Sequence, residues 1–171
     1  MADVLAGTLG LEVLRTDAIR HEMAGRRQPA AEYGQGIYSD SMNFWTYEAL
    51  FDRAQALIGE AVSVVLDGTF RSPQQRDRAV KLARQYGAEV HFVYCRCPRE
   101  IARARIVERI GRGYTLSDAR SELHDVQQME LDSTGDWDGL PVTALDTTDP
   151  VSASVARVLD TLRATPAYAV V

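Results

Sequence analysis

The feature that most limits how this chain can fold is its alternation of short apolar runs with longer helical patterns. The clearest run is Val62 to Leu66, which is almost continuously apolar and ends in an acidic residue, Asp67. Such a run is typical of a parallel strand that helices cover on both faces. Similar runs occur at Val90 to Cys95 and at Val142 to Leu145. This alternation predicts an α/β domain: a parallel sheet in a three-layer arrangement with helices on both faces.

The remaining predicted elements follow from the same two patterns, apolar runs for strands and helical spacing for helices. A short strand over Leu11 to Leu14 is expected to break at Arg15-Thr16-Asp17. Helical spacing, with prolines at two of the helix starts, predicts helices over these ranges: Asn43 to Ile58, Pro73 to Tyr86, Pro98 to Ile110, Leu116 to Leu131 and Val151 to Leu162. In the first of these ranges, the apolar side is expected to hold Trp45, Ala49, Leu50, Ala54 and Leu57.

Length and charge narrow the class of protein. A chain of 171 residues suits one domain, which we place at residues 1–165, with a loose C-terminal tail at 166–171. The net charge of -5 argues against a general binder of nucleic acids or membrane surfaces. No apolar run approaches the roughly 20 residues that span a bilayer, and no signal-peptide pattern is present. The sequence therefore favours a cytoplasmic protein without a membrane partner.

Polar clusters follow three of the predicted strands. They are Thr16-Asp17, Asp67-Gly68-Thr69 and Arg96. Ligands of open parallel sheets bind outside the carboxyl ends of the strands. Asp17 could accept a proton from a substrate hydroxyl, and Asp67 could orient magnesium through water. Either residue alone is about as well explained as a turn or helix-cap residue, but two at matching strand ends favour a functional site.

A row of arginines lies on a later predicted helix. Their spacing of four and three residues puts them on one helix face: Arg105, Arg109 and Arg112. Gly111 and Gly113 mark the start of a segment that could act as a lid. Such a row suits the charge of a transferring phosphoryl group. The alternative is a solvated helix face on which the arginines pair with Glu100 and Glu108.

These segments together resemble small P-loop kinases. Leu14 to Arg20 with Tyr38-Ser39 is similar to their substrate-side segment, and Val64 to Phe70 with Arg76 to their second acidic strand. The lid region is matched by Cys95, Glu100, Arg105, Arg109 and Ser117-Asp118-Ala119. The resemblance runs from Ala2 to about Leu162 and is greatest to zeta-toxin-like kinases of the AAA-family ATPases.

The resemblance implies an ATP-dependent phosphotransferase that uses Mg²⁺ and acts on a hydroxyl group of a small molecule. A nucleic-acid 5′-end is a less favoured acceptor. The implied roles are a catalytic base at Asp17, transition-state stabilisation by Arg105 and Arg109, and a magnesium contact at Asp67. Nucleotide phosphates would meet Arg105, Arg109 and Arg112, and the acceptor would meet Arg20, Tyr38, Thr69 and Arg76.

One part of the family pattern is missing from the 171 residues. These kinases hold phosphates with a Gly-Lys-Ser/Thr loop after their first strand, but the single lysine here is Lys81, within a helix pattern. Met1 to Gly10 resembles the helix that follows that loop. We expect an N-terminally truncated P-loop domain that is complete only with upstream sequence, and whose exposed sheet gap invites association. The alternative is a catalytically inactive remnant that acts as a binding or regulatory module.

Overall fold

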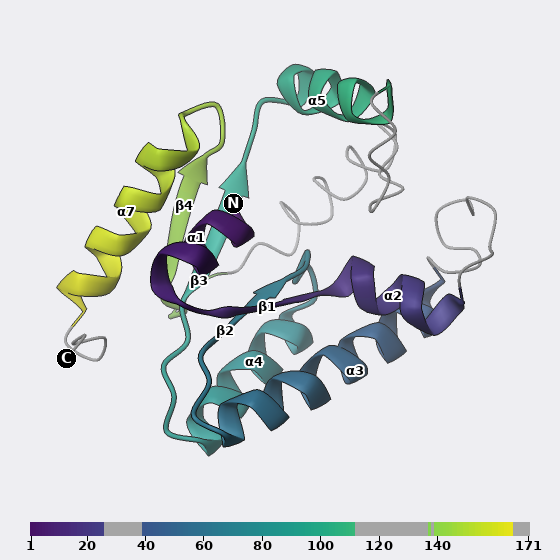
Figure 1. The fold of residues 1–171 in the computed structure, drawn as a ribbon, viewed down its shortest axis with the longest axis vertical. Helices are drawn as coiled ribbons and strands as arrows, with labels where there is room; N and C mark the ends of the chain where they lie inside the picture. The colour runs from purple at the N-terminus through teal and green to yellow at the C-terminus, as the bar shows by residue number, and fades with distance from the viewer. Residues whose placement is uncertain (26–38, 112–136, 138, 166–171) are drawn as a thin grey trace.

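A computed structural model describes residues 1–25, 39–111, 137 and 139–165, without the side chains of residues 109–111. Strands and helices alternate along the chain (Figure 1). The elements are α1 (Ala2–Leu9), β1 (Glu12–Arg15), α2 (Thr16–Ala24), α3 (Asp40–Gly59), β2 (Val64–Asp67), α4 (Pro73–Gln85), β3 (Phe92–Arg96), α5 (Arg99–Gly111), β4 (Val142–Asp146) and α7 (Val151–Ala164). Among the helices of the described residues, none combines the length and the hydropathy of a membrane-spanning segment.

The strands are parallel, as predicted, and they form two separate pairs. β1 pairs with β2, from Glu12 opposite Val64 to Arg15 opposite Asp67. β3 pairs with β4 in the same sense. Within the part of the chain that the structure describes, no strand pairing joins β2 to β3. Each of these two strands therefore has one edge without a neighbouring strand.

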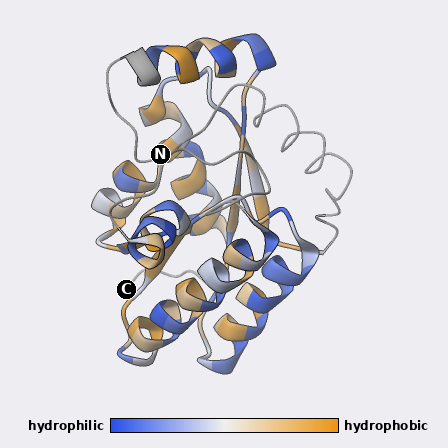
Figure 2. Cartoon of the chain, turned by 90° about the vertical axis from the view of Figure 1, so that its right-hand side faces the viewer, coloured by the Kyte–Doolittle hydropathy of each residue, from blue (hydrophilic) through white to orange (hydrophobic). Residues whose placement is uncertain are grey.

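Helices cover both faces of the strands, so the expected layering is confirmed. One core cluster gathers residues of α2, α3 and α4 against β1, β2 and the first residues of β3 and β4. A second cluster gathers α1 and α7 against the other face of β3 and β4. Phe92 belongs to the first cluster and its neighbour Val93 to the second, because successive strand residues point to opposite faces. The helices carry alternating hydrophilic and hydrophobic stretches, as amphipathic covering helices should (Figure 2).

The first strand ends at Arg15, within its predicted break, and the residues that follow form a helix that was not predicted. α2 begins at Thr16, directly after β1, and runs for nine residues. Its buried residues are Thr16, Ile19 and Arg20. An arginine and a threonine stand where an apolar stripe would be expected, so the apolar pattern that marks a helix is weak here. Figure 1 shows that α2 continues from β1 and leads away from the β3–β4 pair, toward the start of α3.

The buried face of α3 also differs from the prediction. Trp45 is 58% exposed, whereas Tyr47, Leu50, Phe51 and Ala54 are buried. The predicted burial of Leu50 and Ala54 is confirmed, and Ala49 packs against the core. The prediction is wrong for Trp45, and it missed Tyr47 and Phe51. The expected helix over 116–131 and the tail 166–171 lie outside the described residues.

Leu50 gives a direct test of this core. Its side chain is fully buried at 0% exposure. We expect Leu50→Ala to lower the free energy of unfolding by about 2–5 kcal/mol, since truncation loses burial and leaves a cavity. The control is Val107→Ala on α5, where the side chain is 64% exposed and the change should stay within about 0.5 kcal/mol. Urea denaturation followed by circular dichroism measures both, and equal effects would contradict the packing described.

Candidate functional site

The register of β1 on β2 brings two of the predicted polar clusters together. Arg15 and Asp67 are partners across the two strands, so the residues that follow each strand emerge at the same edge. The Thr16 hydroxyl donates a hydrogen bond to the backbone carbonyl of Asp67 at 3.3 Å. Thr16-Asp17 and Asp67-Gly68-Thr69 therefore meet at one edge, as expected for the carboxyl ends of parallel strands.

Gly68 lies where a larger residue does not fit. A Cβ atom at this position would lie 2.8 Å from Thr16 Cγ2 and 3.0 Å from the Tyr47 hydroxyl oxygen. The glycine therefore lets the loop after β2 approach α2 and α3 closely.

Tyr47 holds the same loop from the side of α3, and the sequence did not single it out. Its hydroxyl oxygen accepts a hydrogen bond from the backbone N–H of Phe70 at 2.9 Å and lies 3.5 Å from Thr69 Oγ1. Phe70 has a positive φ of 44°, a strained conformation for a residue with a large side chain. Burial raises the pKa of Tyr47 above its ordinary value, while the hydrogen bonds with Thr69 and Phe70 act in the opposite direction.

Arg76 supports the loop from the side of α4. Its Nη1 donates to the carbonyl oxygens of Phe70 and Arg71, each at 2.8 Å, and its guanidinium lies 4.8 Å from the centre of the Trp137 ring. The residue is only 1% exposed. Arg76 and Tyr47 thus bind the two peptide groups that flank Phe70. A direct contact of Arg76 with an acceptor stays a prediction.

Asp17 and Arg20 form an ion pair on α2. Arg20 Nη1 lies 2.6 Å from Asp17 Oδ1, and Nη2 lies 3.5 Å from the side-chain oxygen of Asn43. The Arg20 side chain is 9% exposed and that of Asp17 is 37% exposed. Among the described residues, Asp17 Oδ2 accepts no hydrogen bond. The carboxylate is therefore held on one oxygen and open on the other.

Asp67 is the residue predicted to act on magnesium. Its Oδ2 accepts a hydrogen bond from Arg15 Nε at 3.1 Å, while Oδ1 has no partner among the described residues. In that part of the chain, no three His, Cys, Asp or Glu side chains gather as a ready-made metal site. Magnesium in phosphoryl-transfer sites commonly takes one or two carboxylates and fills its remaining positions with phosphate and water. One half-open carboxylate at the strand edge fits that role.

Arg105 lies at the carboxyl end of the other strand pair. It donates from Nη2 to the backbone carbonyl of Thr147 at 2.8 Å and from Nη1 to Thr147 Oγ1 at 3.2 Å. Hydrogen bonds from Thr148 lower the pKa of the neighbouring Asp146, and the charges of Arg96 and Arg105 add to this effect. Tyr38, Arg112 and the side chain of Arg109 lie outside the described residues, so the arginine row and the contact of Tyr38 stay predictions.

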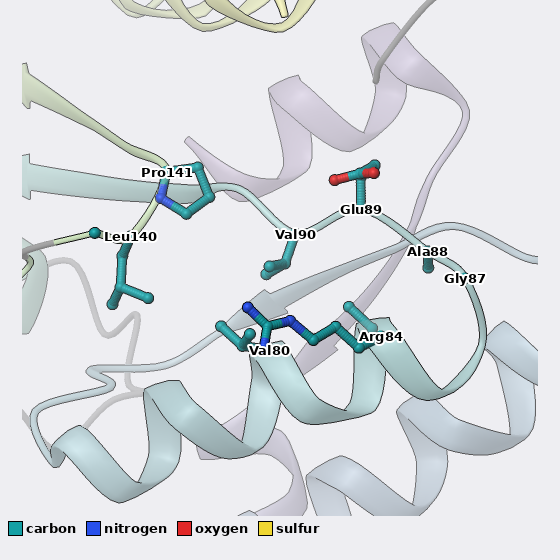
Figure 3. A pocket seen from close by; sticks show the side chains of 10 residues that line it. Val80, Arg84, Gly87, Ala88, Glu89, Val90, Leu140 and Pro141 are labelled. Atoms are coloured by element: carbon teal, nitrogen blue, oxygen red, sulfur yellow. The ribbon is translucent and has the colours of Figure 1, made fainter. Parts of the chain in front are cut away.

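A separate hollow of about 430 Å³ lies at the opposite, amino ends of β3 and β4 (Figure 3). Val80 and Arg84 of α4 line it on one side, and Val90 and Pro141, which precede the two strands, line it on the other. Parallel sheets bind ligands at the other edge, so we place the candidate site at Asp17 and Asp67 rather than here.

Tyr47→Phe tests the support of the loop. The change leaves the buried N–H of Phe70 without its acceptor, so we expect the free energy of unfolding to fall by about 1–3 kcal/mol. Tyr86→Phe is the matched control because Tyr86 is 39% exposed, and it should be nearly silent. Equal midpoints of urea denaturation for the two variants would contradict the role of Tyr47 in holding the loop.

The same pair of variants gives a pH test. The pKa of Tyr47 is raised in the folded protein, so its contribution to stability is complete below about pH 10 and is lost as pH rises toward the folded pKa. The wild type and Tyr86→Phe should show this alkaline loss. Tyr47→Phe should lack that component, and an unchanged alkaline profile in this variant would assign the loss to other groups.

Comparison with known proteins agrees with the arrangement of these strands and helices. Uncharacterized proteins of Mycobacterium bovis and Mycobacterium tuberculosis are 29% identical over 160 residues, or 92% of this chain. The chain spans 30% of the length of these relatives.

Two solved structures share the fold. A sugar kinase from a Janibacter species matches with a TM-score of 0.67 and 20% identity, over 99% of this chain and 90% of that one. A gluconokinase from Sinorhizobium meliloti matches with a TM-score of 0.57 and 18% identity, over 94% and 86%. Residues 1–134 match the family model described as an AAA domain. The chain therefore has a P-loop-kinase-like α/β fold and belongs to the AAA domain family.

Proposed function

We propose that this chain belongs to an ATP-dependent kinase that phosphorylates a hydroxyl group of a small polar molecule. The observation that carries the proposal is the half-open carboxylate of Asp17, which shares a strand edge with the half-open carboxylate of Asp67. A base for the acceptor and a magnesium contact for the nucleotide are the two carboxylate roles that phosphoryl transfer needs. The resemblance to zeta-toxin-like kinases supports the same reaction.

In this proposal the acceptor binds over the loop after β2. Asp17 Oδ2 accepts the hydroxyl proton as the acceptor oxygen bonds to the γ-phosphorus of ATP and the bond to ADP breaks. Arg20 orients the carboxylate through its contact with Oδ1. Thr69, which is exposed beside Tyr47, contacts the acceptor, and Tyr38 and Arg76 stay proposed acceptor residues.

The nucleotide lies toward the second strand pair in this proposal. Arg105, Arg109 and Arg112 meet its phosphates and the charge that develops in the transition state. Magnesium, when bound near Asp67, neutralises phosphate charge. The matched sugar kinase and gluconokinase favour a polyhydroxyl acceptor over a nucleic-acid end.

This reaction also needs a phosphate-binding loop, and residues 1–171 contain no Gly-Lys-Ser/Thr sequence. We propose that a strand carrying this loop pairs between β2 and β3. The edges of β2 and β3 that pair with no described strand support the idea. The absence of the motif within the 171 residues also favours a second candidate function, an acceptor-binding module that does not transfer phosphate.

Asp17→Asn in the natural gene product tests the proposal. We expect turnover on a polyol or sugar-acid acceptor to fall by about 10² to 10⁴, the usual range for loss of a general base, with acceptor affinity nearly unchanged. The matched control is Asp77→Asn, since Asp77 pairs with Lys81 on the outer face of α4. Release of ADP in a coupled assay measures turnover.

Two outcomes would redirect the proposal. Full turnover in Asp17→Asn would remove Asp17 from the role of base. Acceptor binding without any ATP-dependent product, in the natural gene product, would favour the binding module.

A further inference from the structure

The guanidinium of Arg15 bridges two carboxylates that come from different elements. Its Nε lies 3.1 Å from Asp67 Oδ2 at the end of β2, and its Nη2 lies 2.5 Å from Asp3 Oδ1 on α1. Arg15 and Asp67 are also register partners in the parallel pair, so the backbone itself sets them side by side. One guanidinium thus lies between the proposed magnesium contact and a second acidic residue.

All three groups are reachable by water. The side chains of Arg15, Asp67 and Asp3 are 36%, 47% and 74% exposed. Exposed ion pairs of this kind are weak and exchange readily with other ions. Arg15 also contacts Asp3, so it keeps one ion-pair partner if it releases Asp67.

We propose that Arg15 is a positioning residue that sets the affinity of Asp67 for a divalent cation. Without the cation, Arg15 neutralises Asp67 through Oδ2. When the cation approaches the open Oδ1, the guanidinium releases Oδ2 and keeps its contact with Asp3. The proposal rests on the proposed function in one respect, since it takes Asp67 as the magnesium contact.

The physical basis is charge repulsion at short range. A guanidinium bound to one carboxylate oxygen opposes a divalent cation at the other oxygen, because both cations share one negative charge. Removing the guanidinium leaves the full carboxylate charge for the metal. Removing Asp3 has the opposite effect, because Arg15 then has Asp67 as its remaining ion-pair partner.

Titration with Mn²⁺ alone tests this, without nucleotide or acceptor. Line broadening of the backbone amide signals of Thr16 and Gly68, measured by NMR on ¹⁵N-labelled residues 1–171, reports metal near Asp67. We expect Arg15→Ala to lower the half-broadening concentration by about three- to tenfold, and Asp3→Asn to raise it. Asp67→Asn should remove the broadening both alone and combined with Arg15→Ala.

Controls separate this role from a structural one. Arg53→Ala removes an arginine of similar exposure that pairs with Glu22, and it should not alter the broadening. Arg15→Gln keeps most of the side-chain volume; it should also increase Mn²⁺ affinity, and its amide spectrum shows whether the fold is kept. The proposal is overturned if both Arg15 variants bind Mn²⁺ as the wild type does, or if their gain survives Asp67→Asn.

The result is independent of the test of kinase activity. A gain in Mn²⁺ affinity through Asp67, together with no phosphoryl transfer by the natural gene product, would uphold the role of Arg15 and reject the proposed function. Phosphoryl transfer by the natural gene product, together with no effect of Arg15 on Mn²⁺ affinity, would uphold the proposed function and reject the role of Arg15.

Discussion

The candidate site depends on how closely the loop after β2 approaches helices α2 and α3. Gly68 permits that approach because a Cβ atom there would meet Thr16 and the Tyr47 hydroxyl group. The next residues are then fixed from two sides: Tyr47 accepts from the N–H of Phe70, and Arg76 donates to its carbonyl oxygen. Aromatic packing extends this support, since the Phe70 ring contacts both Tyr47 and Phe92 edge-on. The polar residues at the edge thus lie on a hydrogen-bonded and largely buried base.

The electrostatic arrangement follows from the same geometry. Two carboxylates, Asp17 and Asp67, emerge from neighbouring strand ends, and each has an arginine on one oxygen. The two arginines differ in environment: Arg20 is buried beside Asn43, whereas Arg15 is more exposed and shared with Asp3. A buried partner suits a carboxylate that must keep one orientation. A shared, exposed partner suits a carboxylate that must exchange a cation.

The sequence predicted the meeting of Asp17 with Asp67 because the carboxyl ends of adjacent parallel strands share an edge whatever the details of packing. It also predicted parallel strands with helices on both faces, which follow from periodicity. Tyr47, Asn43 and α2 were missed for a different reason. Their roles arise from contacts between elements far apart in the chain, and α2 buries an arginine where a periodic pattern needs an apolar residue. Such contacts leave no local signal in a single sequence.

The central claim is that the edge formed by the ends of β1 and β2 binds the acceptor. The most direct measurement is an NMR titration of ¹⁵N-labelled residues 1–171 with sugar acids and polyols, gluconate among them, without nucleotide. The account predicts that amide shifts concentrate at Thr16, Asp17 and the loop from Gly68 to Phe70, and that Asp17→Asn weakens them little. Shifts confined to the hollow between Arg84 and Pro141, with the β1–β2 edge unchanged, would contradict it.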